Sequence, residues 1–222
     1  MKSNHESTIL PPNFYPKEFN DIYELDPAKS DGAERLFQSK IPIEIRIESD
    51  NHEKNVGVIE NIIVSLYRKE EYGHSLTYRI NLISESDLFF NYSSEINNDN
   101  YKQVQETNKL QLTIEEFGQA ILKMFTKISE DASKYFLMFK MNKGGYGVLE
   151  VYQDLQYKYI ELLKLGFACA TENEIRQNIS FRYSVIQAKH RYLTEKLGDM
   201  TAIIKLKNHS LLGSLQKAFK LD

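Results

Sequence analysis

The sequence predicts an α+β protein: a small antiparallel β-sandwich or barrel head with a helical insertion, followed by a long C-terminal helix with a heptad seam. Three observations support this. Apolar and polar residues alternate over several short stretches after residue 36, which is typical of strands with one buried face. Helical spacing of apolar residues appears between and after these strands. Proline, which interrupts helices and strands, does not occur after Pro42.

Residues 1–35 are expected to form a flexible, Pro-containing N-terminal arm. All five prolines lie before residue 43, and the arm shows no periodic pattern of apolar residues. Such a segment cannot bury enough apolar surface to offset the entropy lost on ordering it. The alternative, a docking segment, stays open because the arm contains the aromatic residues Phe14, Tyr15, Phe19 and Tyr23.

Residues 36–170 are expected to form the head. Ile41, Ile43, Ile45 and Ile47 alternate with polar residues or proline and predict the first strand. The same pattern predicts strands at residues 56–67, 76–83 and about 110–114, then at 135–141, 146–152 and 157–167. Short polar turns join neighbouring strands, which favours antiparallel pairing and requires a second layer over the apolar face.

A helical insertion is expected to supply that layer. A short polar turn opens at Asn97, and a longer helix begins near Thr113, where Thr113 and Glu116 form a capping box. The wide apolar face of this helix suits packing on a sheet, and it consists of Phe117, Ile121, Leu122, Met124, Phe125 and Ile128.

Residues 171–222 are expected to form a long helix and a short terminal helix. The long helix starts with a second capping box, made by Thr171 and Glu174. Gaps of four and three residues then alternate without a break, which indicates a helix-pairing seam. The seam residues are Ile179, Tyr183, Ile186, His190, Leu193, Leu197, Met200 and Ile204. Whether this helix pairs with a second chain or packs on its own head stays open.

Composition limits the function. The chain has 222 residues, 41% hydrophobic and 27% charged, which suits one globular domain with appendages. Its net charge of −3 gives no basic footprint for nucleic acid, and no stretch approaches the roughly 18–20 apolar residues of a membrane span. The single cysteine, Cys169, is expected in the core of a protein from the reducing cytoplasm.

No motif for catalysis, a cofactor or a metal is found. Gly144, Gly145 and Gly147 lack a phosphate-binding spacing and indicate a hairpin turn. The five histidines share no metal-ligand spacing with cysteines or carboxylates. We therefore expect no enzyme activity, no cofactor, no metal and no small-molecule substrate.

The order of several motifs resembles a known head. These motifs are Leu36-Phe37 before Ile41-Pro42-Ile43, the D-x-F-F-x-Y element at residues 87–92, Ile96 with Asp99 and Tyr101, residues 110–117, Leu149-x-Val151, Tyr157 and Leu163-x-Leu165. Over residues 36–182 they resemble the N-terminal head family of spindle assembly abnormal protein 6, the centriolar cartwheel protein.

The resemblance implies a structural, self-associating protein. In that family the α+β head, related to heads of end-joining DNA-repair scaffolds, precedes a parallel coiled coil, and heads join through a hairpin that carries one bulky apolar residue. That residue corresponds to Tyr157 here, and Leu155 at the hairpin tip could replace or assist it. Because the chain is short, it looks like the SAS-6-like paralogue that lacks the extended coil.

The implied partners are further copies of the chain, as a homodimer or higher oligomer, and cytoskeletal or centriolar proteins. The implied locations are the cytoplasm and cytoskeleton, at a centriole or basal body, the flagellar base or an apical complex. The alternative is an adaptor that binds a partner protein through its head, without forming rings or filaments.

Overall fold

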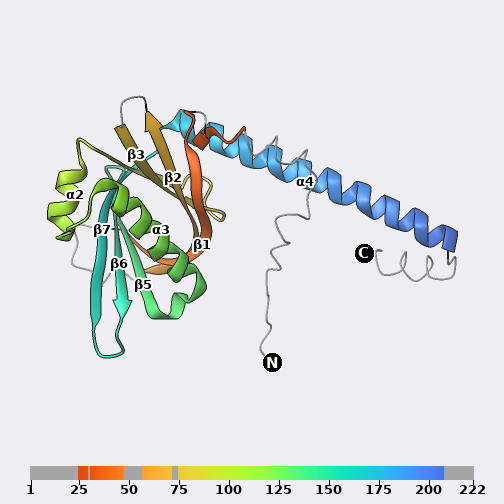
Figure 1. Ribbon diagram of the computed structural model, residues 1–222. Coiled ribbons are helices and arrows are strands. Elements are labelled where there is room, and N and C mark those ends of the chain that lie inside the picture. Colours follow the sequence, from red (N-terminus) through yellow and green to blue (C-terminus); the bar gives the residue numbers. More distant parts are fainter. Residues whose placement is uncertain (1–24, 30, 48–56, 72–74, 208–222) are drawn as a thin grey trace. The chain divides into compact units, whose positions relative to one another are not determined.

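The computed structural model describes residues 25–29, 31–47, 57–71 and 75–207 (Figure 1). The chain divides into two compact units. One consists of Pro27–Gln177 and contains the head, and the other consists of Met1–Asp26 with Asn178–Asp222. The short terminal helix expected after residue 207, and most of the N-terminal arm, lie outside the described residues.

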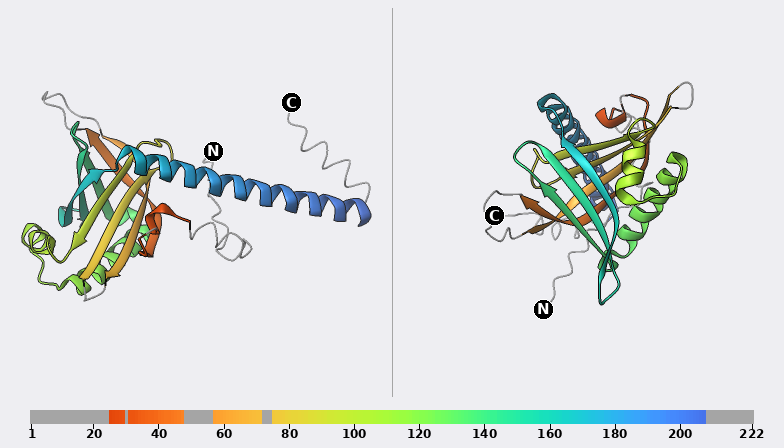
Figure 2. Two further views of the ribbon diagram at one scale, coloured as in Figure 1. Left: turned by 90° about the horizontal axis from the view of Figure 1, so that it is seen from above. Right: turned by 90° about the vertical axis from the view of Figure 1, so that its left-hand side faces the viewer.

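The head is a closed barrel of seven strands (Figures 1 and 2). The strands are β1 (Glu34–Ile47), β2 (Val58–Glu71), β3 (Ser75–Ser84), β4 (Asn91–Asn97), β5 (Tyr135–Met141), β6 (Tyr146–Asp154) and β7 (Tyr159–Cys169). Their order around the barrel is β1-β2-β3-β4-β7-β6-β5. The predicted α+β head with a helical insertion and a long C-terminal helix is confirmed.

One pairing makes the sheet mixed. Every neighbouring pair is antiparallel except β1 and β5, which run parallel through Glu44–Ile47 and Met138–Met141. A parallel pair needs a long crossover connection, and the chain between β1 and β5 contains three further strands and the helical insertion. Because this contact closes the barrel, the fold is complete only when two strands that are far apart in the sequence have paired.

Most strand predictions agree with the structure, and one is wrong. The alternation in β3 matches its burial, with Leu76, Tyr78, Ile80 and Leu82 buried. Residues 110–113 form no strand, because Thr113 is instead the N-cap of a helix. The alternation pattern did not predict β4, whose buried face includes the polar Ser94 between Tyr92 and Ile96.

Two helices pack against the strands of the barrel. Helix α3 (Ile114–Glu130) begins with the predicted capping box between Thr113 and Glu116, and packs mainly on β1. Its Phe125 stacks on Phe37 of β1, with ring centroids 5.8 Å apart. Helix α2 (Tyr101–Asn108) packs on β4 and β7, which pair through only two residues each. Short 3-10 turns η2 (Pro27–Lys29) and η3 (Ala132–Lys134) precede β1 and β5.

An aromatic cluster joins the strands inside the barrel. Phe139 of β5 is fully buried and makes edge contacts with Phe90, Tyr92 and Phe167 at centroid distances of 5.6, 4.9 and 5.8 Å. Gly147 lies beside this ring, and a Cβ atom there would overlap the ring of Phe139. Close packing in this cluster therefore requires the aromatic ring at position 139 and a glycine at position 147.

The long helix α4 spans Glu172–Lys207. Its predicted capping box is present, since Thr171 N–H donates to Glu174 Oε2 at 2.7 Å and Glu174 N–H donates to Thr171 Oγ1 at 3.4 Å. The expectation that Cys169 lies in the core is wrong, because this residue is exposed at the end of β7. No helix among the described residues is long and apolar enough to cross a membrane.

Candidate self-association sites

The tip of the β6–β7 hairpin presents the predicted knob residue to solvent. Leu155 N–H donates to the carbonyl of Lys158 at 3.0 Å, and the Asp154 side chain accepts from Gln156 N–H at 2.6 Å. Gln156 has a φ of 70°, in the left-handed region that turns require. Tyr157 is 84% exposed, whereas Leu155 is half-buried. The turn thus directs Tyr157 outward and holds Leu155 against the hairpin.

Aromatic side chains from three strands support the hairpin. The ring of Phe136 on β5 lies 6.2 Å from that of Tyr152 on β6 and 5.9 Å from that of Tyr159 on β7. Tyr159 and Ile160 are also exposed, so the apolar surface at this end extends beyond Tyr157. Sequence analysis did not select these two residues, because their strand pattern alone does not say which face is covered.

A buried carboxylate anchors the base of the hairpin. Glu150 on β6 accepts from Lys140 Nζ of β5 at 2.8 Å, from Lys164 Nζ of β7 at 3.0 Å and from the Tyr152 hydroxyl at 2.9 Å. Burial favours the neutral acid, but these three donors outweigh it and hold the pKa of Glu150 at about 2. Burial together with the Glu150 charge raises the pKa of Tyr152 to about 12. The network ties three adjacent strands together.

Two asparagine side chains complete hydrogen bonds at the gap between β4 and β7. Asn108 Nδ2 donates to the carbonyl of Lys164 at 3.0 Å, and Asn108 Oδ1 accepts from Lys164 N–H at 2.6 Å. Asn100 does the same for β4, since it accepts from Asn97 N–H at 2.9 Å and donates to the carbonyl of Glu95 at 2.8 Å. Each carboxamide takes the place of a neighbouring strand, so these backbone groups are not available for strand pairing with another chain.

The seam of α4 is largely uncovered. Tyr183, Ile186, Leu193, Leu197 and Met200 are between 47% and 62% exposed. His190 is exposed too, while Ile179 and Ile204 are half-buried. The two buried residues of this helix, Val185 and Ala188, lie outside the seam. The seam is therefore a regular stripe of apolar side chains that is available to a partner helix.

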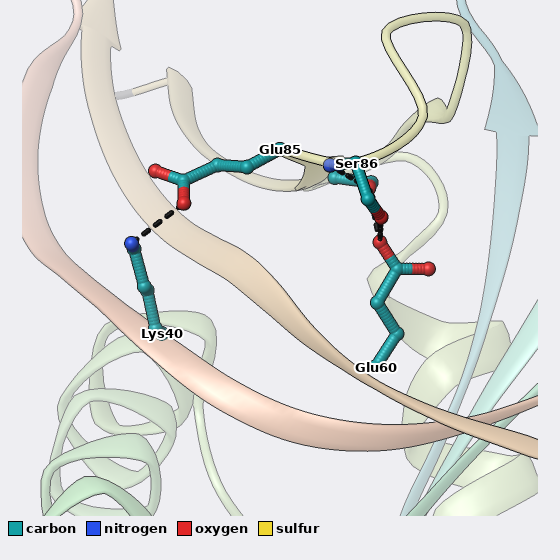
Figure 3. Close-up of polar contacts among 5 residues, drawn as sticks. Lys40, Glu60, Glu85 and Ser86 are labelled. Carbon is teal, nitrogen blue, oxygen red and sulfur yellow. Dashed lines mark hydrogen bonds and ion pairs between the residues drawn. The ribbon is translucent and has the colours of Figure 1, made fainter. Parts of the chain in front are cut away.

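A second exposed apolar site lies in the loop between β3 and β4. Ser84 Oγ accepts from the N–H groups of Ser86 and Asp87 at 3.0 and 2.8 Å, and its hydroxyl donates to the Glu60 carboxylate. The Ser86 hydroxyl also donates to the Glu60 carboxylate (Figure 3). Asp87 Oδ1 accepts from Phe89 N–H at 2.9 Å. The loop is therefore well ordered although Leu88 and Phe89 are exposed.

Ion pairing adds to this loop on the side of β1. Lys40 Nζ of β1 lies 2.6 Å from the Glu85 carboxylate, and both side chains are about half exposed (Figure 3). Such an exposed pair contributes little stability by itself. Residues 87–92 contribute to the family resemblance alone, and no role was expected for Leu88 and Phe89. The signal was present, since consecutive apolar residues next to polar turn residues are unusual in a loop.

No cofactor or metal centre is apparent in the part of the chain that the structure describes. Within it, no three His, Cys, Asp or Glu side chains are grouped as metal ligands would be. A cavity of about 140 Å³ lies between β2, β3 and the residues before β1, and its Arg79 already pairs with Asp31 at 3.3 Å. What the geometry offers is two kinds of apolar contact surface, on the head and on the helix.

A head domain followed by a long helix with an uncovered heptad seam is an arrangement typical of proteins that assemble through helix pairing. The family model described as the centriolar protein SAS N-terminal domain matches residues 35–167, more than half of the chain. The chain belongs to this family. No curated protein matches the chain.

Solved structures support the same fold. An N-terminal fragment of Leishmania SAS-6 that contains part of its coiled-coil domain is similar with a TM-score of 0.62 and 18% identity, over 78% of this chain and 98% of that one. The N-terminal coiled-coil dimer of C. elegans SAS-6 is similar with a TM-score of 0.59 and 10% identity, over 76% of this chain and 98% of that one. At these identities the likeness shows the fold.

Proposed function

We propose that this protein is a structural, self-associating component of a centriole-related cytoskeletal assembly. Membership of the SAS head family supports a non-enzymatic structural role. The observation that carries the proposal is the presence of two separate exposed apolar surfaces on one chain, the hairpin tip around Tyr157 and the seam of α4. A protomer with two different self-contacts can build a ring or filament, whereas one self-complementary contact stops at a dimer.

The head contact uses Tyr157, assisted by Leu155 at the hairpin tip. Burial of one aromatic side chain contributes about 1.5–3 kcal/mol in transfer terms, and association itself has a large entropic cost. The head contact is therefore weak in isolation. It becomes effective when helix pairing has already joined the chains, because linked contacts act at a high effective concentration.

The helix contact uses the seam from Ile179 to Ile204. Its central part has Leu193 and Leu197, which suit a two-stranded helix pair, and Tyr183 and His190, which bring polar atoms into the seam. Tyr183 has part of its hydrogen bonding satisfied within the helix, since its hydroxyl accepts from Gln187 Nε2 at 2.8 Å. This pairing makes the basic unit of assembly a homodimer of modest stability.

The location that fits this role is a centriole or basal body, the flagellar base or an apical complex, with other cytoskeletal proteins as partners. Fluorescent tagging of the full chain in the source cell tests the location. A diffuse cytoplasmic signal would contradict the proposal.

Purified full-length protein tests the assembly. Electron microscopy at high concentration is expected to show rings or filaments, and light scattering is expected to show concentration-dependent growth beyond a dimer. Tyr157→Glu should abolish this growth and leave the dimer, whereas Leu193→Asp should abolish the dimer. An adaptor that binds another protein would instead remain a monomer or a simple dimer at every concentration, with Tyr157→Glu having no effect.

A further inference from the structure

Exposed apolar side chains surround the point where α4 begins. Cys169, the last residue of β7, pairs with Tyr92, and Ala170 N–H donates to the carbonyl of Asn91 at 2.8 Å. These contacts place the start of α4 next to the β3–β4 loop, which carries Leu88 and Phe89. On the other side, Cys169 N–H donates to the carbonyl of Gly145 at 2.7 Å, next to Tyr146. We call Leu88, Phe89 and Tyr146 the collar.

The collar has two properties of a contact surface. Phe89 is 72% and Tyr146 is 66% exposed, which is unusual for large aromatic side chains with no other role in the fold. The loop that holds Leu88 and Phe89 is fixed by the Ser84, Glu60 and Asp87 hydrogen bonds, so little conformational entropy is lost when these two side chains bind. The turn that holds Tyr146 is fixed similarly, since Asn142 Oδ1 accepts from Gly144 and Tyr146 N–H groups.

We propose that the collar is an interface with the collar of a second copy of this chain, next to the start of the paired α4 helices. This inference rests on the helix pairing proposed above. Two helices that pack side by side lie about 8–10 Å apart, so parallel pairing along the α4 seam brings the second collar within reach of the first. The contact is isologous, because the two-fold axis of a parallel pair relates each collar to an identical one.

The inference has a structural consequence for the assembly. A seam with Tyr183 and His190 is a weak dimer contact, and the collar adds apolar area at its N-terminal end without lengthening the helix. The collar contact also fixes the angle between the two heads, because it holds the heads to each other directly, whereas the seam holds only the helices. The collar and the hairpin tip lie at opposite ends of β7, so one does not compete with the other.

The single cysteine of the chain allows a direct measurement. Cys169 is exposed and adjoins the collar, so nitroxide labels on this residue report the distance between two collars in the dimer. We expect a short distance, about 10 Å between the helix axes plus the two label arms. A distance near the length of the 36-residue α4 helix, about 54 Å at 1.5 Å per residue, would indicate antiparallel pairing and overturn the inference.

Substitution separates the collar from the seam. Phe89→Glu is expected to weaken the dimer at least about tenfold in Kd, measured by sedimentation equilibrium. Tyr157→Glu is the control, because it places the same charge on another exposed aromatic residue, at the other end of the barrel, whose proposed contact acts in growth beyond the dimer and not in the dimer. It should leave the dimer Kd unchanged. Unfolding curves of both variants, recorded at concentrations below the dimer Kd, should match that of the unsubstituted protein, since neither side chain is buried.

The outcomes distinguish the two proposals. If Leu193→Asp abolishes the dimer while Phe89→Glu leaves the Kd unchanged, the collar contact is wrong and helix pairing stands. If Leu193→Asp leaves the dimer intact, helix pairing itself is wrong, and the collar inference falls with it. A Phe89→Glu effect equal to that of Tyr157→Glu would also contradict the collar, because it would reflect added charge rather than a lost contact.

Discussion

The two ends of the barrel expose aromatic side chains to similar degrees but support them differently. At the hairpin end, Tyr157 is 84% exposed and lies on a turn closed by one backbone hydrogen bond and by one from Gln156 N–H to the Asp154 carboxylate. At the α4 end, Phe89 is 72% exposed on a loop fixed by a network of serine and carboxylate side chains.

This difference predicts how each end would bind if the two proposed contacts form. A turn with few internal bonds can adjust when its knob enters a partner, which suits a weak contact used repeatedly in an assembly. A loop held by a polar network keeps its apolar side chains in one place, which suits a contact of fixed geometry. The exposed fraction of a side chain does not distinguish an adjustable turn from a fixed loop. The hydrogen bonds within the turn or loop do distinguish them.

The largest expected effect tests the core beneath the α4 end. Phe139→Ala removes the ring that contacts Phe90, Tyr92 and Phe167, and should lower the free energy of unfolding by about 3–5 kcal/mol. Urea denaturation measures this change. The matched control is Phe136→Ala, which removes a half-buried ring on the hairpin side and should cost less. An equal loss of unfolding free energy in the two variants would show that the two ends of the barrel depend on the same packing.

Glu150→Gln tests the support of the hairpin end. The change leaves Lys140, Lys164 and Tyr152 without their shared carboxylate and should cost about 2 kcal/mol of unfolding free energy. Glu130→Gln, at the exposed end of α3, is the control and should change stability by less than about 0.5 kcal/mol. A Glu150→Gln variant as stable as the control would mean that the network is not a stabilising element.

The same carboxylate predicts a dependence of stability on pH. The folded-state pKa of Glu150, about 2, lies below its ordinary value of 4.5, so its contribution is fully present above pH 4.5. That contribution should be lost as the pH falls from 4.5 toward 2. The unfolding free energy measured over this range should fall more steeply for the unsubstituted protein than for Glu150→Gln. Identical slopes would contradict the lowered pKa.

Ser84→Ala tests the network of the α4 end and should have a smaller effect. Ser86 and Asp87 N–H groups lose their acceptor, which should cost about 1–2 kcal/mol and speed amide hydrogen exchange in the loop. Amides of the hairpin turn serve as the internal control and should exchange at unchanged rates. If exchange in the loop stays slow, the network is not what orders Leu88 and Phe89.

Gln156→Gly should have the smallest effect, and in the opposite direction. Gln156 has a positive φ of 70°, which costs a residue with a Cβ roughly 1 kcal/mol, so glycine is expected to stabilise the protein by about 0.5–1 kcal/mol. Gln153→Gly, in the adjacent strand β6, should destabilise by a similar amount. Thermal unfolding compares the two. A loss of stability in both variants would argue against strain at position 156.

Local sequence patterns determined much of this fold. The alternation at Ile41 and Ile43, the capping boxes at Thr113 and Thr171, and the uninterrupted seam in α4 each depend on residues a few positions apart. Such short-range signals act in the same way wherever the segment lies in space. Tyr157 is different, because only the family resemblance points to it as a knob, and the alternation pattern places residue 157 in a strand, whereas β7 begins at Tyr159.

Features that depend on distant residues required the tertiary structure. The parallel pairing of β1 with β5, the strand-like bonds of Asn108 to Lys164, and the burial of Glu150 between two lysines join residues whose sequence gives no sign of each other. The exposure of Cys169 and the position of Phe89 beside the start of α4 are of the same kind. Sequence periodicity says which face of an element is apolar, but only the packing of all elements decides which apolar residues stay uncovered.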